Sequence, residues 1–406
     1  MPVTFDPAVE TQKLRDHLAS HDKPIAFLFG AGTSAAVAGT DGKPLVPTVA
    51  VLTERVADAV RAKSPRFKAA WDAIVAALPA DQRTIEDVLS AVRRMCAAVI
   101  GSDKLAGLNA AQLTELEQTI QHTIAREVRP EAARFPDTLP HQSLGRWLGR
   151  IDRPTPVEIF TTNYDTLIER ALETEWVPLF DGFVGAREPF FSPASLAREP
   201  MAPGRRWTRL WKVHGSVNWS ARSGPSLGDR IVRGPENDVG EMILPSQLKY
   251  DESRKQPYLA MIDRFRRVLT EREDAVLVTA GYSFGDQHLN EVILEALDAN
   301  PRLHVFALCF EDPEPDSELG REARRRNNII VLGPKEAIVG GRVGSWLLRD
   351  PGRSVGRVAD IFDIKPMGGT ASGGTAAGGA TATGTLVLGD FNKLCVLLDQ
   401  IVGSDA

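Results

Sequence analysis

One feature constrains the fold most: an uninterrupted apolar run at residues 24–29 leads directly into the turn Gly30-Ala-Gly-Thr-Ser. Such a run indicates a strand that is buried on both faces of a parallel sheet. Glycines after such a strand let the backbone approach a pyrophosphate, and the next helix offers N–H groups to it. The turn therefore has the G-x-G-x-x-A form of a dinucleotide-binding turn, with a tight strand-to-helix turn as the alternative. The acidic ribose ligand of a hydride-transferring enzyme should follow about 20 residues on, but the nearest candidate, Glu54, lies inside a predicted helix.

Apolar runs of the same kind recur along the chain and alternate with helical patterns. The expected strands occupy residues 157–161, 208–213, 242–244, 275–280, 303–310 and 328–332. The expected helices among them occupy residues 254–269, 286–297 and 335–348. Strand–helix alternation predicts an α/β fold, a doubly wound parallel sheet with helices on both faces. Residues 66–150 show helical spacing throughout, so we expect a helical subdomain inserted into this fold.

The sequence predicts five segments along the chain. They are the start of the sheet domain at residues 1–65, the helical insertion at 66–150, the remainder of the sheet domain at 151–367, a flexible linker at 368–384, and a docking strand and helix at 385–406. The linker contains only Gly, Ala, Ser and Thr, so it has no large side chain to pack into a core.

The C-terminal segment carries more apolar surface than it can bury by itself. Its large apolar residues are Leu386, Leu388, Phe391, Leu394, Leu397 and Leu398. An element of this length must pack on another surface. We expect residues 385–402 to mediate assembly, either between copies of this chain or with a partner. Docking on its own domain is the alternative.

Polar motifs follow three of the predicted strands, at the edge where open α/β sheets bind ligands. Asn163 and Asp165 follow the strand at 157–161, and their side chains suit a carboxamide, a ribose hydroxyl or a water. Asp165 suits a helix cap equally well. His214 follows the strand at 208–213 and begins the run His-Gly-Ser. A histidine there suits general base chemistry, because imidazole ordinarily titrates near neutral pH.

The remaining motif, Gly-Tyr-Ser-Phe-Gly-Asp-Gln-His, begins at Gly281 after the strand at 275–280. It predicts a nucleotide-contacting loop. A strand-to-helix turn capped by Asp286 is the alternative.

Composition excludes several classes of protein. The 53 acidic and 48 basic residues give a formal net charge of −5, so no basic field indicates nucleic-acid binding. The three cysteines, Cys96, Cys309 and Cys395, lie far apart, which excludes a four-cysteine zinc site and suits a reducing cytoplasm. No apolar run reaches the ~18 residues of a membrane span, and residues 1–18 lack the apolar core of a secretion signal. We therefore expect a cytoplasmic protein without a bound metal ion or a membrane anchor.

The motifs GAGTS, TTNYD, VHGS and GYSFGDQHLN occur in one order, each after a predicted strand. In this order they resemble the sirtuin-like domain family, in particular its prokaryotic branch that acts in anti-phage defence. The resemblance covers roughly residues 20–335. Protein-deacylating sirtuins carry a four-cysteine zinc module and a G-I-P-D-F-R-like segment after the first glycine turn, and this sequence has neither. The helical stretch 66–150 instead resembles the cap of the defence branch, whose members hydrolyse NAD+.

The resemblance implies a Rossmann-like domain that binds NAD+ and cleaves its nicotinamide–ribose bond without a metal ion. It implies that Asn163 holds the nicotinamide ribose and positions a water, that Asp165 grips the carboxamide, and that His214 binds a ribose hydroxyl and acts as general base. The implied pyrophosphate contacts are Gly30, Ala31, Gly32 and Ser34. The implied adenosine contacts are Gly281 and Ser283, with Asp286 and His288 as additional contacts.

The resemblance also implies a biological role, anti-phage defence by depletion of NAD+, which is a form of abortive infection. Such an enzyme needs control, and the family implies control by homo-oligomer assembly or by a partner DNA-translocating ATPase or helicase. Two other functions remain open: an NAD+-dependent protein deacylase, and a non-catalytic nucleotide-binding subunit that gates a partner.

Overall fold

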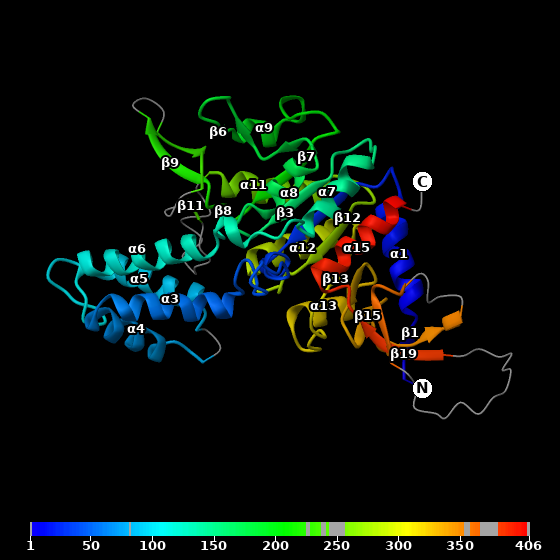
Figure 1. Ribbon diagram of the computed structural model, residues 1–406, viewed down its shortest axis with the longest axis horizontal. Coiled ribbons are helices and arrows are strands. Elements are labelled where there is room, and N and C mark those ends of the chain that lie inside the picture. The colour runs from blue at the N-terminus through cyan, green and yellow to red at the C-terminus, as the bar shows by residue number, and fades with distance from the viewer. Residues whose placement is uncertain are drawn as a thin grey trace.

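A ten-stranded sheet forms the centre of the protein, in the order β1-β16-β15-β14-β13-β12-β2-β3-β7-β4 (Figure 1). The computed structural model describes residues 2–80, 83–224, 228–236, 241–242, 256–352, 358–365 and 381–403. The strands of this sheet are β1 (Thr4–Phe5), β2 (Ile25–Phe29), β3 (Glu158–Thr161), β4 (Leu179–Phe180), β7 (Thr208–Lys212), β12 (Val276–Ala280), β13 (His304–Leu308), β14 (Ile329–Leu332), β15 (Glu336–Val339) and β16 (Arg342–Trp346). From β14 to β4 all neighbouring strands are parallel. The predicted α/β fold with a doubly wound parallel sheet is confirmed.

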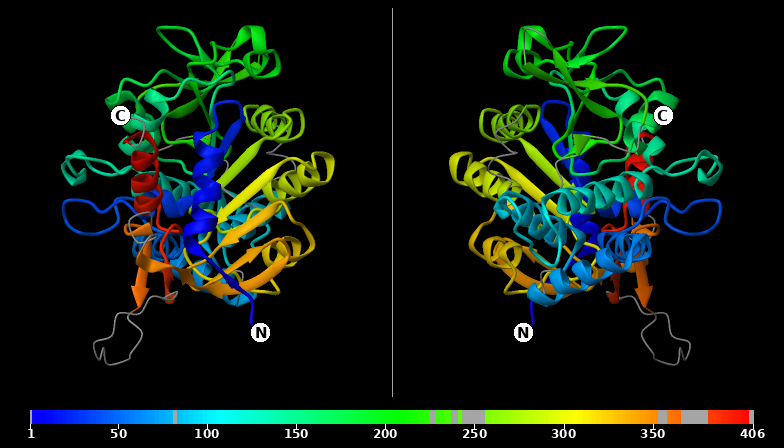
Figure 2. Two further views of the ribbon diagram at one scale, coloured as in Figure 1. Left: turned by 90° about the vertical axis from the view of Figure 1, so that its right-hand side faces the viewer. Right: turned by 90° about the vertical axis from the view of Figure 1, so that its left-hand side faces the viewer.

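Helices cover both faces of the sheet (Figure 2). One face carries α1 (Pro7–Ala19), α7 (His141–Arg150), α8 (Leu167–Thr174) and α15 (Phe391–Gly403). The other face carries α11 (Tyr258–Thr270), α12 (Gln287–Ala299) and α13 (Glu318–Arg325). Successive side chains of a strand point to opposite faces. In β2, Phe27 and Phe29 therefore pack with the first group, and Ala26 and Leu28 pack with the second.

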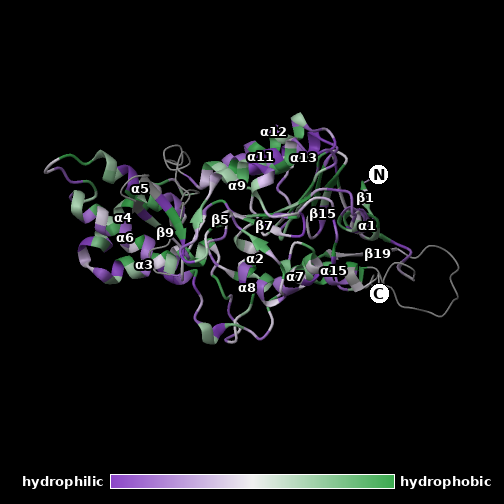
Figure 3. Cartoon of the chain, turned by 90° about the horizontal axis from the view of Figure 1, so that it is seen from above, coloured by the Kyte–Doolittle hydropathy of each residue, from purple (hydrophilic) through white to green (hydrophobic). Residues whose placement is uncertain are grey.

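Four long helices project from one side of the sheet domain (Figure 1). They are α3 (Val49–Lys63), α4 (Pro65–Ala77), α5 (Ile85–Ala98) and α6 (Ala110–Glu127). Each is amphipathic (Figure 3), and their apolar sides meet in a core that includes Val56, Trp71 and Leu116. This core continues to Leu167 and Ala171 of α8. At the start of α5, Thr84 and Asp87 form a capping box. Residues 66–150 are thus helical as expected, while the subdomain boundaries stay a prediction.

A second, smaller sheet has the order β5-β6-β10-β9 and lies beyond the β7–β4 edge of the main sheet (Figure 1). Its strands are β5 (Phe183–Val184), β6 (Phe190–Phe191), β9 (Trp219–Gly224) and β10 (Gly228–Arg233). The rings of Phe183 and Trp219 pack at 5.1 Å between centroids. Two shorter strands, β8 (Gly215–Ser216) and β11 (Glu241–Met242), pair next to it.

Residues 335–348 form a hairpin rather than the expected helix, so that prediction is wrong. Strands β15 and β16 pair antiparallel around Gly340 and Gly341. These glycines have φ values of 57° and 74°. Two-residue hairpin turns of this kind need positive φ at both central residues, which glycine supplies at no steric cost. The Gly-Gly pair is therefore the decisive local signal in this segment.

The predicted linker at 368–384 is partly wrong, because residues 381–384 belong to β19 (Thr381–Leu386). This strand pairs antiparallel with β17 (Leu348–Arg349) and β18 (Phe362–Lys365). The rest of the predicted linker, up to residue 380, lies outside the described residues, as do residues 243–244 and 254–255 of two expected elements and residues 404–406.

The C-terminal segment packs on its own domain. Its large apolar residues are all buried in the core that also holds α1 and α7, namely Leu386, Leu388, Phe391, Leu394, Leu397 and Leu398. The Phe391 ring meets the Phe29 ring edge-on at 5.4 Å between centroids, and Asp399 forms an ion pair with Arg146 of α7 at 2.9 Å. The structure thus favours the alternative, docking on its own domain, because the apolar surface that motivated an assembly role is covered within the chain. The assembly role of residues 385–402 stays a prediction.

Among the described residues, none of the helices combines the length and the apolar character that a bilayer crossing requires.

Candidate active site

The predicted site motifs meet at the carboxyl ends of four adjacent strands, β12, β2, β3 and β7. The glycine turn follows β2 and leads into the short helix α2 (Ala31–Ala35). Because the four strands are parallel neighbours, the residues that follow them lie on one edge of the sheet. Strand order thus unites motifs that are far apart in the sequence.

The glycine turn packs main chain against main chain on the loop that follows β12. A Cβ atom on Gly30 would lie 2.4 Å from the Gly281 carbonyl oxygen, and a Cβ atom on Gly281 would lie 2.4 Å from the Thr33 nitrogen. Gly281 also has a φ of 59°, a region that favours glycine. These contacts explain why glycine is needed at Gly30, Gly32 and Gly281 before any ligand is considered.

Several N–H groups of the turn already donate within the protein. Those of Gly30 and Gly32 donate to the carbonyl oxygens of Ala280 and Gly281 at 3.1 and 3.0 Å. Ala31 and Gly32 are exposed, so the outer side of the turn faces solvent there. The predicted pyrophosphate contacts stay a prediction, with Ala31 at the accessible start of α2.

Asn163, Asp165 and Ser34 form one buried hydrogen-bonded group. The Ser34 hydroxyl donates to Asp165 Oδ2 at 2.7 Å, and Asn163 Nδ2 donates to Ser34 Oγ at 2.8 Å. Asn163 Nδ2 also donates to Thr33 Oγ1 at 3.0 Å. The other carboxylate oxygen of Asp165 accepts from Leu167 N at 3.1 Å, at the start of α8. Asp165 therefore serves both as a helix-end acceptor and as a member of the site.

Lys212, the last residue of β7, is a site residue that the sequence interpretation missed. Its buried ammonium donates to the carbonyl oxygens of Tyr164 and Asp165 and to Glu169 Oε1, the last at 3.0 Å. Burial raises the pKa of Glu169, although Lys212 opposes the shift. A lysine within the apolar run Leu-Trp-Lys-Val was the available signal, because a buried charge needs partners.

His214 and Asp286 form a buried pair. Nε2 of His214 lies 2.9 Å from Asp286 Oδ2, and the two side chains are 5% and 8% exposed. Since a carboxylate only accepts, Nε2 is the donor. The second oxygen of Asp286 accepts from the His288 and Leu289 nitrogens at 3.0 and 3.3 Å and so caps α12. The sequence interpretation gave Asp286 a nucleotide contact, and the structure places it against the predicted general base.

Two predicted site residues lie further out on the same loop and helix. Ser283 is exposed, and its hydroxyl oxygen accepts from Gly285 N at 3.3 Å. His288 sits in the first turn of α12, where its Nδ1 lies 3.9 Å from Glu291 Oε2. Their predicted nucleotide contacts stay predictions.

Comparison with known proteins identifies the class of this domain. Residues 157–332 match the family model of the SIR2-like domain. This part of the chain is therefore similar to SIR2-like domains. No curated protein matches the chain.

The matched part of the SIR2-like domain runs from the start of β3 to the end of β14. It contains Asn163, Asp165, His214 and the loop from Gly281 to Asp286, while the glycine turn precedes it. SIR2-like domains are in general NAD-dependent enzymes. The residues present fit that use, because the accessible glycine turn and the buried polar group adjoin on one edge of the sheet.

Within the residues that the structure describes, the SIR2-like domain has no cluster of three or more His, Cys, Asp or Glu side chains arranged to hold a metal ion. The absence of zinc stays a prediction. A separate open cavity lies between α8 and the small sheet, and its walls include Thr166, Glu169, Asn218 and Arg233.

Proposed function

We propose that this SIR2-like domain hydrolyses NAD+ to ADP-ribose and nicotinamide. The observation that carries the proposal is the burial of Asn163, Asp165 and the His214–Asp286 pair on one edge of the sheet, beside the glycine turn. Buried and mutually hydrogen-bonded polar groups that do not serve the core are typical of a site prepared for a charged or polar reactant.

The proposed reaction breaks the bond between C1′ of the ribose and the nicotinamide nitrogen. The bonding electrons leave with nicotinamide, and positive charge develops on the ribose. A carboxylate stabilises such a charge more strongly in a buried site than in water. A water oxygen then bonds to C1′, and its proton is released.

In this proposal Asn163 holds the nicotinamide ribose and the attacking water, and Asp165 grips the carboxamide. His214 takes the proton from the water, and the Asp286 carboxylate stabilises the resulting imidazolium. The glycine turn binds the pyrophosphate at Ala31, and Gly281 and Ser283 face the adenosine. No metal ion takes part.

The experiment is a product assay on the full chain with NAD+ and an acetylated peptide. Free ADP-ribose supports hydrolysis, and acetyl-ADP-ribose would instead support a deacylase. The domain is a non-catalytic nucleotide-binding subunit if the chain binds NAD+ but forms neither product, both with the purified protein and in cells that express the chain.

Two variants test the assigned residues. His214→Ala and Asn163→Ala should each lower NAD+ cleavage by at least ~100-fold, since loss of a general base costs roughly 10²–10⁴ in rate. His304→Ala is the matched control, because His304 is the first residue of β13 and so lies at the amino ends of the strands, whereas the site lies at their carboxyl ends. Near-normal turnover by a folded His214→Ala protein would overturn the assignment.

We also propose a role in anti-phage defence through NAD+ depletion, with activity controlled by self-assembly or by a partner ATPase. This part rests on the order of the sequence motifs and on the harm that uncontrolled NAD+ hydrolysis would cause. Expression of the active chain should lower cellular NAD+ and growth only when phage is added. An equal fall in cellular NAD+ with and without phage would contradict the proposed regulation of the activity.

A further inference from the structure

The loop between β12 and α12 is held in a strained conformation. Phe284 has a φ of 56°, which residues other than glycine seldom adopt. Gly281, at the start of the same loop, has a φ of 59°. Asp286 ends the loop and carries the carboxylate that meets His214. The conformation of this loop therefore decides where that carboxylate lies.

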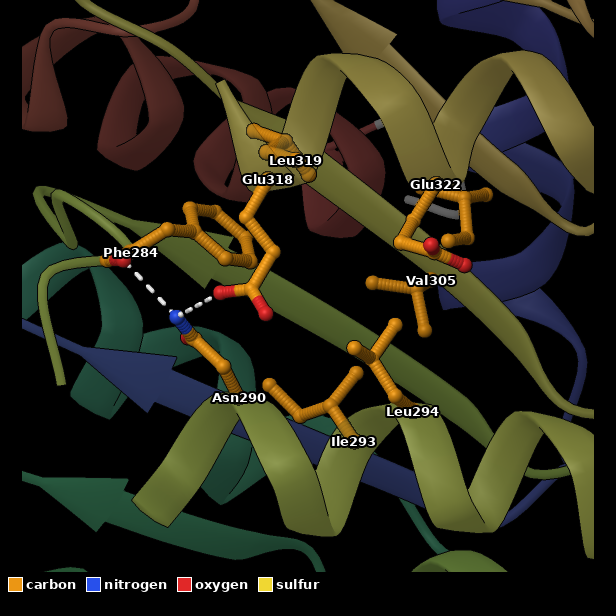
Figure 4. A pocket seen from close by; sticks show the side chains of 9 residues that line it. Phe284, Asn290, Ile293, Leu294, Val305, Glu318, Leu319 and Glu322 are labelled. Carbon is orange, nitrogen blue, oxygen red and sulfur yellow. Dashed lines mark hydrogen bonds between the residues drawn. The ribbon is translucent and has the colours of Figure 1, made fainter. Parts of the chain in front are cut away.

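Asn290 of α12 holds this loop from behind (Figure 4). Its Nδ2 donates to the Phe284 carbonyl oxygen at 2.7 Å and to Glu318 Oε2 at 3.0 Å. The Tyr282 hydroxyl lies 2.9 Å from Asn290 Oδ1 and 3.2 Å from the Asp286 carbonyl oxygen. The buried Asn290 amide thus binds the strained residue Phe284, and it also binds the Tyr282 hydroxyl, which contacts the Asp286 backbone.

Apolar packing supports the same arrangement. The Phe284 side chain lines a cavity between α12 and α13, together with Ile293 and Leu319 (Figure 4). Glu318 begins α13, so the Asn290–Glu318 bond also ties the loop to the next helix. Packing therefore holds the Phe284 ring, and the hydrogen bond from Asn290 holds its carbonyl oxygen. Together they fix the backbone conformation of Phe284.

We propose that Asn290 is a positioning residue: it fixes the strained Gly281–Asp286 loop and thereby sets the Asp286 carboxylate against His214. The inference rests on the proposed function for its kinetic test, but not for its spectroscopic test. Asn290 acts through Asp286, and it is not itself placed to touch substrate.

The alternative is that Asn290 only stabilises the fold, as a buried hydrogen-bonded asparagine does anywhere. Asn300, at the other end of α12, is the matched control. It is similarly buried, and its Nδ2 donates to the carbonyl oxygens of Leu269 and Arg272 at 2.9 and 3.0 Å. Loss of either side-chain amide removes two donated hydrogen bonds and one accepted hydrogen bond, but only Asn290 adjoins the loop.

The kinetic test compares Asn290→Ala and Asn300→Ala at a temperature where both are folded. Asn290→Ala should lower kcat for NAD+ cleavage by roughly 10- to 100-fold, because small misplacements of a catalytic group cost that much. KM should change far less, and Asn300→Ala should leave both constants near the parent values. Equal effects of the two substitutions on kcat would overturn the proposal.

A double-mutant cycle then tests the route through Asp286. In an Asp286→Ala background, Asn290→Ala should change kcat by no more than about twofold, since the carboxylate that it positions is gone. Full additivity of the two losses would show that Asn290 acts by another route and would refute the inference. Asn290→Asp is a second variant, for the case that alanine unfolds the loop.

The spectroscopic test needs no turnover. The side-chain nitrogen resonances of His214, assigned with His214→Ala, report its hydrogen bond to Asp286. They should move in Asn290→Ala as they move in Asp286→Ala, and should be unchanged in Asn300→Ala. If the chain cleaves no NAD+ but these shifts occur, the proposed function fails and the positioning role stands. Unchanged His214 resonances in Asn290→Ala reject the positioning role.

Discussion

Replacement of Phe391 by alanine tests whether the C-terminal helix belongs to its own domain. Phe391 is 1% exposed, and its ring packs against those of Phe29 at 5.4 Å and His141 at 4.6 Å between centroids. Truncation of a fully buried phenylalanine costs about 3–5 kcal/mol, which includes the cavity that it leaves. The edge-on contact with Phe29 favours the upper part of that range. A loss of this size is a large share of the 5–15 kcal/mol that typically stabilises a folded domain.

The assay is urea unfolding at two protein concentrations about twentyfold apart, with Val396→Ala as control. Val396 lies on the same helix but is 36% exposed, and its truncation should stay within about 0.5 kcal/mol. Packing within one chain makes the loss caused by Phe391→Ala independent of concentration, whereas docking on a second copy makes it concentration-dependent. A loss below about 1 kcal/mol, or one that changes with concentration, would refute packing of α15 within its own chain.

Three further outcomes follow from the structure. Gly281→Ala should abolish nucleotide binding measured by calorimetry, because its Cβ would lie 2.4 Å from the Thr33 nitrogen; retained affinity would contradict the loop contact. Burial lowers the pKa of His141 to about 3, below its usual 6.5, so the unfolded chain binds a proton that the folded chain does not. His141 alone should therefore lower the unfolding free energy by about 1.4 kcal/mol per pH unit from pH 6 to pH 4, so the fall should be gentler in His141→Leu; parallel curves would reject this. Elemental analysis of the purified protein should find no zinc, and one zinc per chain would revive the deacylase.

The sequence predicted those parts of the fold whose signals are local. The apolar run at 24–29 suffices for a strand buried on both faces, and the polar motifs after the strands suffice to mark one edge of the sheet. The helix predicted at residues 335–348 was wrong because helical spacing and a Gly-Gly turn compete there, and the turn determines the backbone conformation. For the C-terminal segment the sequence left open which surface covers it, because the pattern of an amphipathic helix does not identify its packing partner.

The candidate site illustrates the limit of sequence reasoning in another way. His214 and Asp286 were both singled out, but they are separated by 72 residues. Their contact depends on the placement of β2 and β3 between β7 and β12, which no local pattern contains. Lys212 was missed because it lies in an apolar strand pattern, where one charged residue does not change the prediction of a strand. Tertiary pairing, not residue type, makes these side chains a site.

The late position of α15 in the chain has a consequence for synthesis on the ribosome. Asn392 at the start of this helix donates to the Ala36 carbonyl oxygen at the end of α2, a contact that spans 356 residues. Chains fold from the N-terminus as they emerge, so the glycine turn waits for this support until almost all other elements have been made. A ribosome that stopped before Thr381 would release a chain that contains Asn163, Asp165 and His214 but lacks the helix that backs the turn. The order of translation thus delays the completion of the candidate site until the end of synthesis.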